Sequence, residues 1–152
     1  MTDLWPADLA TVGAKPPSAI LQEQAALLGR KTKNIVRAEV LRRADPTPSS
    51  RGDAHLGIQF MYLFVLHAPA LGDYRFRLFA ITHDVDLYPV QFLVDDAIAQ
   101  EIGPINAKEG IIARNEEQFT SILSQVLRSQ KTRKVVQSIL SQSTAQPDLD
   151  QP

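Results

Sequence analysis

The chain of 152 residues contains no cysteine. This absence excludes disulfide bonds, thiolate nucleophiles and cysteine-based zinc sites, and it favours a reducing compartment. The sequence also lacks an apolar run long enough to cross a membrane. Its first residues are interrupted by Asp3 and Asp8 and do not match a secretory leader. We therefore expect a cytoplasmic protein that does not enter a membrane.

An excess of charge of one sign is missing too. The net charge of −1 argues against a dedicated nucleic-acid binder, for which a basic excess is expected. The sequence has no internal repeat and no linker long enough to separate two domains. The pattern predicts an irregular arm over residues 1–17, one domain over residues 18–143 and a disordered tail over residues 144–152. Trp5 is expected to pack its ring against the domain.

Common catalytic motifs are absent as well. The sequence has no GxSxG elbow, no GxGxxG turn and no GxxxxGK[ST] loop, so it carries none of the usual signatures of a serine hydrolase or a phosphate cradle. The residues indicate no catalytic group, no cofactor and no resident metal. We expect a protein without enzymatic activity.

What the chain does contain is a dense apolar region over residues 56–94. Alternating residues predict a half-buried strand over 34–43, and three further strands follow at 55–68, 74–82 and 87–94. Pro89 places the last of these at an edge of the sheet. The strand over 55–68 is apolar on both faces, so its second face should be covered by residues 95–110 or by another subunit.

Helical periodicity brackets this region. Residues 18–28 form an apolar stripe, with Ser18 as the expected N-cap and Gly29 just beyond the end. Residues 115–128 and 129–143 carry stripes that are out of phase, which predicts a break near residues 129–131. Residues 95–103 fit a short helix and residues 110–113 a short strand. The fold class is α+β: an antiparallel meander of four to five strands, with one N-terminal and two C-terminal helices packed across one face.

Two features are candidates for function. The turn His83-Asp84-Val85-Asp86 combines an imidazole with two carboxylates, which is a ligand set for divalent metals, although a solvated hairpin turn explains it more simply. Charge is also unevenly spread. Residues 28–51 carry a net charge of +5, residues 73–109 carry −4, and residues 128–134 form a second basic cluster. The candidate binding residues are Arg37, Arg42, Arg43, Arg75, Arg77, His83, Asp84 and Asp86.

Opposite charges on one chain suit electrostatic docking of a protein partner or self-association. The favoured function is a non-catalytic protein-interaction module of the immunity, adaptor or chaperone kind, able to form a homodimer. Two alternatives stay open. A nucleic-acid binder requires the basic clusters at 28–43 and 128–134 to converge on one face. A metal-dependent enzyme requires a concave site at residues 83–86.

Overall fold

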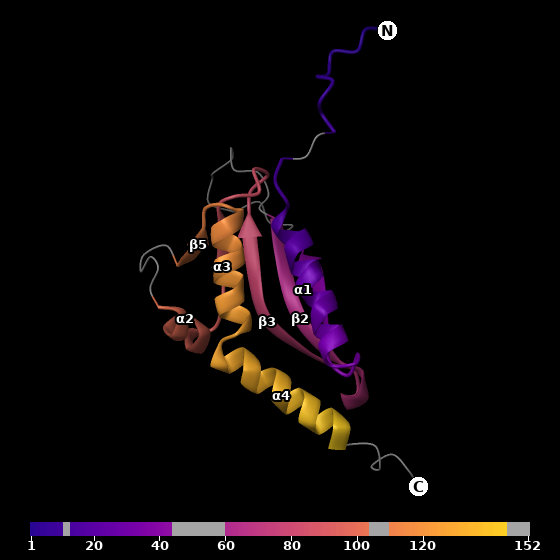
Figure 1. Ribbon diagram of the computed structural model, residues 1–152, viewed down its shortest axis with the longest axis vertical. Coiled ribbons are helices and arrows are strands. Elements are labelled where there is room, and N and C mark those ends of the chain that lie inside the picture. Colours follow the sequence, from indigo (N-terminus) through magenta and orange to yellow (C-terminus); the bar gives the residue numbers. More distant parts are fainter. Residues whose placement is uncertain (11–12, 44–59, 104–109, 146–152) are drawn as a thin grey trace.

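The computed structural model describes residues 1–10, 13–43, 60–103 and 110–145, arranged as in Figure 1. In chain order the elements are α1 (Pro17–Lys31), β1 (Arg37–Arg43), β2 (Phe60–Ala68), the 3-10 helix η1 (Pro69–Leu71), β3 (Tyr74–His83), β4 (Val90–Leu93), α2 (Asp96–Ile102), β5 (Ile111–Ala113), α3 (Glu116–Leu127) and α4 (Gln130–Ala145). The described part does not include residues 44–59, which contain the start of the predicted strand 55–68. It also does not include residues 146–152 of the predicted tail.

The five strands form one antiparallel sheet in the order β1-β2-β3-β4-β5. Strands that follow one another in the sequence are neighbours in the sheet, as short connections require. Between β2 and β3 the register shifts: Phe64 pairs with Phe79 but Val65 pairs with Arg77, so Leu78 has no partner. This β-bulge adds one residue to β3. The predicted α+β meander is confirmed.

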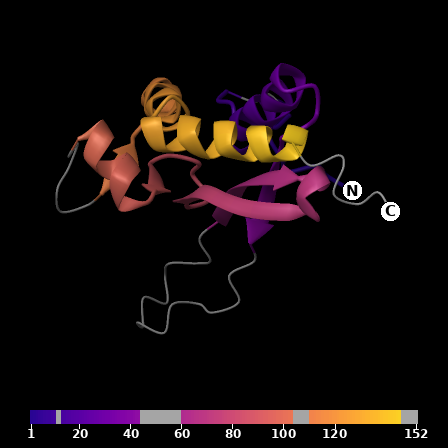
Figure 2. The same cartoon turned by 90° about the horizontal axis from the view of Figure 1, so that it is seen from below.

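Helices α1, α3 and α4 lie on one face of the sheet, so the domain has two layers (Figure 2). Aromatic rings fill part of the space between the layers. The ring centroids of Phe64 and Phe79 are 5.0 Å apart, those of Phe79 and Phe92 are 6.2 Å apart, and those of Phe92 and Phe119 are 5.2 Å apart. Three strands and α3 therefore share one aromatic layer, in which each ring pair contributes about 0.5–1.5 kcal/mol beyond its buried area.

Helix α1 begins one residue earlier than predicted. Pro16 is its N-cap and Pro17 its first residue, so Ser18 is not the cap. Proline suits this position because its fixed φ is helical and its missing N–H would have no partner in the first turn. Gly29, expected beyond the end, lies inside the helix. A Cβ added at Gly29 would lie 3.0 Å from the side-chain oxygen of Asn34, so a larger residue there would require the Asn34 side chain to shift.

The start of α3 is capped by side chains in a pattern that differs from a capping box in one bond. The side chain of Asn115 accepts a hydrogen bond from the backbone N–H of Gln118 at 2.8 Å. The side-chain oxygen of Gln118 in turn accepts from the N–H of Arg114 at 2.8 Å, not from that of Asn115. The two bonds give partners to the backbone N–H groups of Arg114 and Gln118, and so fix the position at which α3 begins.

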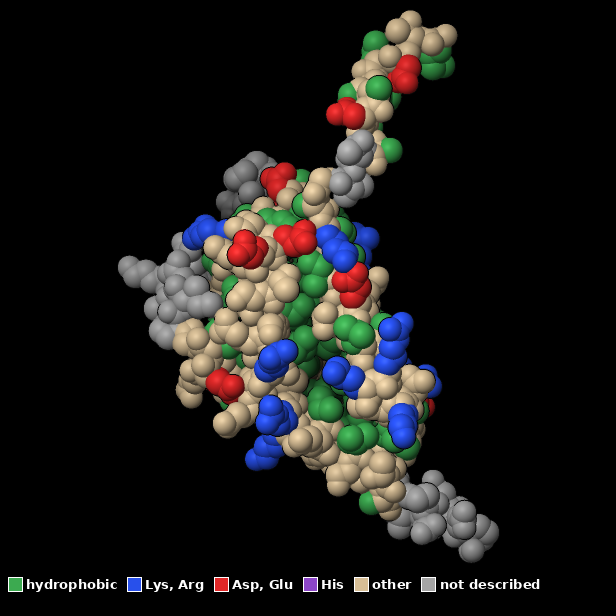
Figure 3. All heavy atoms as spheres, viewed as in Figure 1, with side chains coloured by type: hydrophobic (Ala, Val, Ile, Leu, Met, Phe, Trp, Pro, Cys, Tyr) green, Lys and Arg blue, Asp and Glu red, His purple; other side chains and the backbone are tan. Residues whose placement is uncertain are grey.

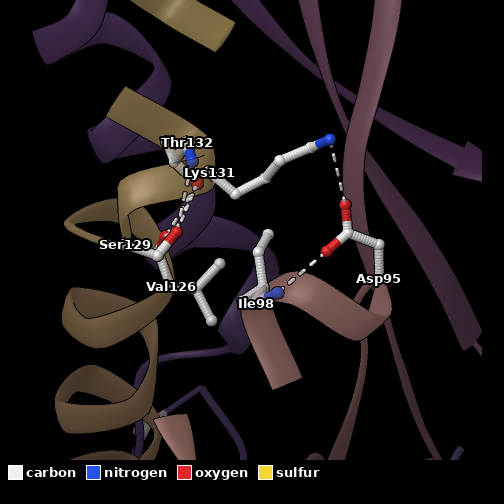
Figure 4. Close-up of polar contacts among 6 residues, drawn as sticks. All are labelled: Asp95, Ile98, Val126, Ser129, Lys131 and Thr132. Atoms are coloured by element: carbon white, nitrogen blue, oxygen red, sulfur yellow. Dashed lines mark hydrogen bonds and ion pairs between the residues drawn. The ribbon is translucent and has the colours of Figure 1, made fainter. Parts of the chain in front are cut away.

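The predicted break between the last two helices is confirmed, and Ser129 is its centre (Figure 4). The buried Ser129 hydroxyl donates to the carbonyl of Val126 at 2.8 Å and accepts from the backbone N–H of Thr132 at 3.2 Å. It thus ends α3 and caps α4. Asp95 caps α2 through the N–H of Ile98 at 2.9 Å. Its second oxygen lies 3.8 Å from the Lys131 ammonium at the start of α4.

The prediction that the strand with Pro89 lies at an edge is wrong. Strand β4 pairs with β3 on one side and with β5 on the other. Pro89 precedes Val90, the first residue of the strand, so its missing N–H removes no ladder bond. In the described sheet the outer strands are β1 and β5.

Of the two predicted covers for the second face of β2, the described part of residues 95–110 does not provide one, and cover by another subunit stays a prediction. Helix α2 packs against α3 and α4 instead, and residues 104–109 lie outside the described residues. The face of the sheet on which the described residues place no helix, here called the helix-free face, presents Leu41, Leu63 and Leu93. These three residues share one row of cross-strand neighbours through Ala80. Leu41 is 41% exposed and Leu93 is 37% exposed.

The prediction that Trp5 packs against the domain is also wrong. Residues 1–10 extend away from the body of the domain in Figure 1, and Trp5 is 75% exposed. The expectation rested on the large area that an indole buries. The indole therefore stays exposed and does not add to the buried core.

We predict that Ser129→Ala lowers the free energy of unfolding by about 1–2 kcal/mol, because the cap of α4 and one bond at the end of α3 are lost. Urea denaturation followed by circular dichroism measures this change. The control is Ser141→Ala at an exposed position of α4, for which a change within about 0.5 kcal/mol is expected. Equal effects of both substitutions would contradict the role of Ser129.

Candidate functional site

An apolar groove runs between α1 on one side and α3 with α4 on the other (Figure 3). Its volume is about 640 Å³. The side chains of Phe64, Leu66 and Leu78 form its floor, and the three helices form its walls. The wall residues are Ile20, Gln24, Leu27, Leu28, Lys31, Thr120, Leu123, Ser124, Leu127, Arg128, Thr132, Arg133, Val136 and Gln137.

The groove exists because helices α1 and α3 pack against different strands. Helix α1 packs against β1 and α3 packs against β5, at the two sides of the sheet. Strands β2 and β3 pass between them in Figure 1. The bulge contributes directly, because the unpaired Leu78 lies in the floor beside Phe64 and Leu66.

Apolar side chains reach the mouth of the groove. Leu27 is 39% exposed, and Leu28, Leu127 and Val136 are half-buried. They come from three different helices and surround a floor that is itself buried. A contiguous apolar surface of this kind marks an interaction site more often than scattered exposed leucines do.

The rim of the groove is basic. Lys31, Arg128 and Arg133 line it and are exposed, and none of the described residues that line it is acidic. Lys31 ends α1 and Arg128 is the C-cap of α3, positions at which the helix dipole favours cations. Next to an apolar surface of low dielectric, these charges attract an anion more strongly than they would in open water.

The two predicted basic clusters meet only in part. Lys31 of the first cluster joins Arg128 and Arg133 of the second at the groove. Arg37 and Arg43 belong to the first cluster but lie on the opposite face of the sheet, as their pairing with His67 and Met61 shows. A nucleic-acid surface would require the clusters 28–43 and 128–134 to converge on one face, and only part of residues 28–43 does so.

On the helix-free face one of the predicted arginines, Arg75, takes part in an ion pair. Arg75 lies 2.7 Å from Glu39, measured from Nη1 to Oε1. The ring of His67 lies between Glu39 at 3.3 Å and Asp73 at 3.0 Å. Arg77 is on the same face, opposite Val65. Glu39 and Asp73 offset part of the positive charge on this face, so it is less cationic than its arginines alone suggest.

Arg42 and His83 lie on the helix-bearing face and belong to an aromatic cluster. The Arg42 guanidinium stands 5.2 Å from the ring centroid of Phe60. The His83 ring stacks on Phe60 at 5.6 Å and on Tyr62 at 5.8 Å. His83 is 5% exposed, and its Nδ1 lies 2.6 Å from the carbonyl oxygen of Asp84. These contacts hold the imidazole in the domain.

The carboxylates of Asp84 and Asp86 are exposed and do not join the buried ring of His83. Across the described residues, no three side chains of His, Asp or Glu are grouped so as to hold a metal ion. Nor is any helix in the described part of the chain long and apolar enough to cross a membrane. The geometry of this turn gives the enzyme alternative no support.

The groove residues were not singled out from the sequence. One signal was present: Leu27 and Leu28 are adjacent in α1, so its apolar stripe is wider than one contact with a sheet requires. The position of Leu78 carried no such signal. A strand pattern alone does not reveal where a bulge will turn a residue toward the helices.

Comparison of the chain with models of protein families, with curated proteins and with solved structures found no match. The geometry and the charge of the groove are therefore the features that bear on function.

We predict that divalent metal ions leave the thermal midpoint of unfolding unchanged, because His83, Asp84 and Asp86 do not converge. The measurement is a thermal melt with Mg²⁺, Mn²⁺ or Zn²⁺ at about 1 mM, since a ligand of the folded state raises the midpoint. A rise that disappears in Asp84→Asn would contradict this prediction and restore the metal site at the turn.

Proposed function

We propose that this chain is a non-catalytic protein-interaction module whose groove binds a short segment of a partner protein. The segment carries apolar side chains flanked by Asp or Glu. The observation that carries the proposal is the combination of an apolar floor and mouth with a rim formed by Lys31, Arg128 and Arg133. The proposal includes a cytoplasmic location, which the lack of cysteine favours.

The shape of the groove supports a peptide segment. Grooves between helices bind amphipathic segments whose apolar side chains enter the groove while their polar side chains stay at the rim. Here Leu27, Leu127 and Val136 offer apolar contacts from three helices. A small-molecule site of similar volume would place several polar groups around the ligand to fix its orientation. Most polar residues of this groove instead lie on exposed helix surfaces, and the hydroxyl of the buried Thr132 already donates to the carbonyl of Val126.

The charges support an acidic partner. A carboxylate that approaches the rim meets Lys31, Arg128 and Arg133 without an acidic competitor among the described lining residues. Such complementarity speeds association and selects the partner, although exposed pairs add only about 0–1 kcal/mol each. The apolar contacts must therefore supply most of the binding free energy.

Single-stranded nucleic acid fits the groove less well. Such ligands stack their bases on exposed aromatic rings beside a basic track. Phe64 is the aromatic residue that lines the groove, and it is only 2% exposed. The basic rim alone would give binding that depends strongly on salt and little on apolar contacts.

We expect Leu27→Asp to weaken binding of an apolar, acidic peptide about 10-fold or more, since a carboxylate at the mouth removes about 1.5 kcal/mol of apolar contact and repels the ligand. The probe is a panel of fluorescein-labelled peptides of about 12 residues, long enough to follow the groove as an extended or helical segment. Fluorescence anisotropy compares an apolar, acidic sequence with an apolar, basic one and a polar, acidic one.

The matched control is Leu41→Asp. Leu41 is 41% exposed, close to the 39% of Leu27, but it lies on the helix-free face. A second pair, Arg128→Glu and Arg43→Glu, tests the rim against the opposite face in the same way. Equal losses in both members of a pair, or equal binding of all three peptides, would overturn the proposal. Displacement of the peptide by a single-stranded oligonucleotide would point to a nucleic-acid interface.

A further inference from the structure

The first ten residues form an arm that combines exposed apolar side chains with acidic ones. Leu4 is 88% exposed, Trp5 is 75% exposed and Leu9 is 56% exposed. Asp3 and Asp8 are interspersed among them, and the arm extends away from the domain (Figure 3). This is the class of segment that the groove is proposed to bind.

The base of the arm is held at the N-terminal ends of α1 and α3. The backbone N–H of Lys15 donates to Glu116 at 3.1 Å, and the Lys15 carbonyl accepts from the Tyr88 hydroxyl at 3.3 Å. The Lys15 ammonium pairs with Glu23. Burial, with a smaller contribution from the Glu116 carboxylate, raises the pKa of Tyr88 and keeps its hydroxyl protonated as a donor. These contacts fix where the arm leaves the domain.

We infer that the arm of one copy docks in the groove of a second copy of this chain. The inference rests on the proposed function, because it assigns a ligand to the same groove. Leu4, Trp5 and Leu9 match the apolar floor and mouth. Asp3 and Asp8 match the basic rim formed by Lys31, Arg128 and Arg133.

The length and the direction of the arm favour a second copy. Ten extended residues span about 33 Å, and a helix of 12 residues such as α3 is about 18 Å long, so the arm can follow the groove. The chain leaves the Lys15 anchor pointing away from the domain (Figure 1), so its own groove would require a reversal. Each copy has one arm and one groove, and mutual exchange gives a closed dimer with two identical contacts.

An exchanged arm also regulates the groove. It occupies the surface on which an acidic partner segment would bind, so the two compete. Dimer formation rises with protein concentration, and partner binding then requires displacement of the arm. The same chemistry that recognises a partner would in this way keep the apolar mouth covered when no partner is present.

Trp5 is the only tryptophan in the chain, so intrinsic fluorescence reports the environment of the arm directly. The full-length chain is diluted stepwise and its emission maximum is compared with its size by analytical ultracentrifugation. We expect a monomer with the emission of a water-exposed indole at low concentration. A dimer with emission at shorter wavelength is expected at high concentration.

Leu27→Asp is expected to raise the protein concentration at which half of the chains are dimeric about tenfold or more. The matched Leu41→Asp is expected to leave this concentration unchanged. Asp3→Lys combined with Asp8→Lys should also weaken the dimer, without any change in the domain. A shift in emission that does not depend on concentration, in a chain that stays monomeric, would show the arm on its own domain and overturn the inference.

The inference and the proposed function fail separately. If the acidic peptides bind the groove but Trp5 stays exposed in a monomer at every concentration, the exchange of arms is wrong and the peptide-binding function stands. If the peptide panel fails to bind but the dimer forms and is lost in Leu27→Asp, the arm is the ligand of the groove and the general function is wrong. A dimer that is unaffected by Leu27→Asp but lost in Leu41→Asp would place the interface on the helix-free face and overturn the inference.

Discussion

The contact between Phe119 of α3 and Phe92 of β4 determines where the helical layer can lie. The centroids of the two rings are 5.2 Å apart. Phe92 also contacts Phe79, and Phe79 contacts Phe64 in the middle of the sheet. This contact holds α3 over one side of the sheet. At the other side α1 packs against β1, and Leu21 of α1 and Val36, which precedes β1, belong to the buried core. The strip of sheet between the two helices remains as the floor of the groove. The proposed binding surface is thus a direct result of how the core is packed.

Local sequence patterns predicted the elements well, and tertiary contacts explain what they missed. The meander and the break at Ser129 follow from periodicity and from short connections, which act within a few residues. The exposure of Trp5 and the interior place of β4 depend on which surfaces meet in three dimensions. The groove combines residues from five elements and a bulge at Leu78, and no short pattern contains that information.

The net charge of −1 conceals two different surfaces. At the groove, Lys31, Arg128 and Arg133 stand beside apolar side chains without acidic neighbours in the described lining. On the helix-free face, Glu39 and Asp73 engage Arg75 and His67. Counting charges along the chain places Lys31, Arg128 and Arg133 in basic clusters and Arg75 in an acidic stretch, which does not show which charges are paired. Only the fold separates those that are balanced from those that remain available to a ligand.

Strand β1 has a consequence for how copies of this chain can associate. It is an outer strand of the described sheet, and its backbone offers hydrogen-bonding groups along one side. Its seven residues include Arg37, Glu39, Arg42 and Arg43, so a foreign strand added there would lie against a ladder of like and unlike charges. Charged outer strands oppose edge-to-edge growth into fibrils. The charges of β1 thus oppose open-ended stacking of chains along this edge.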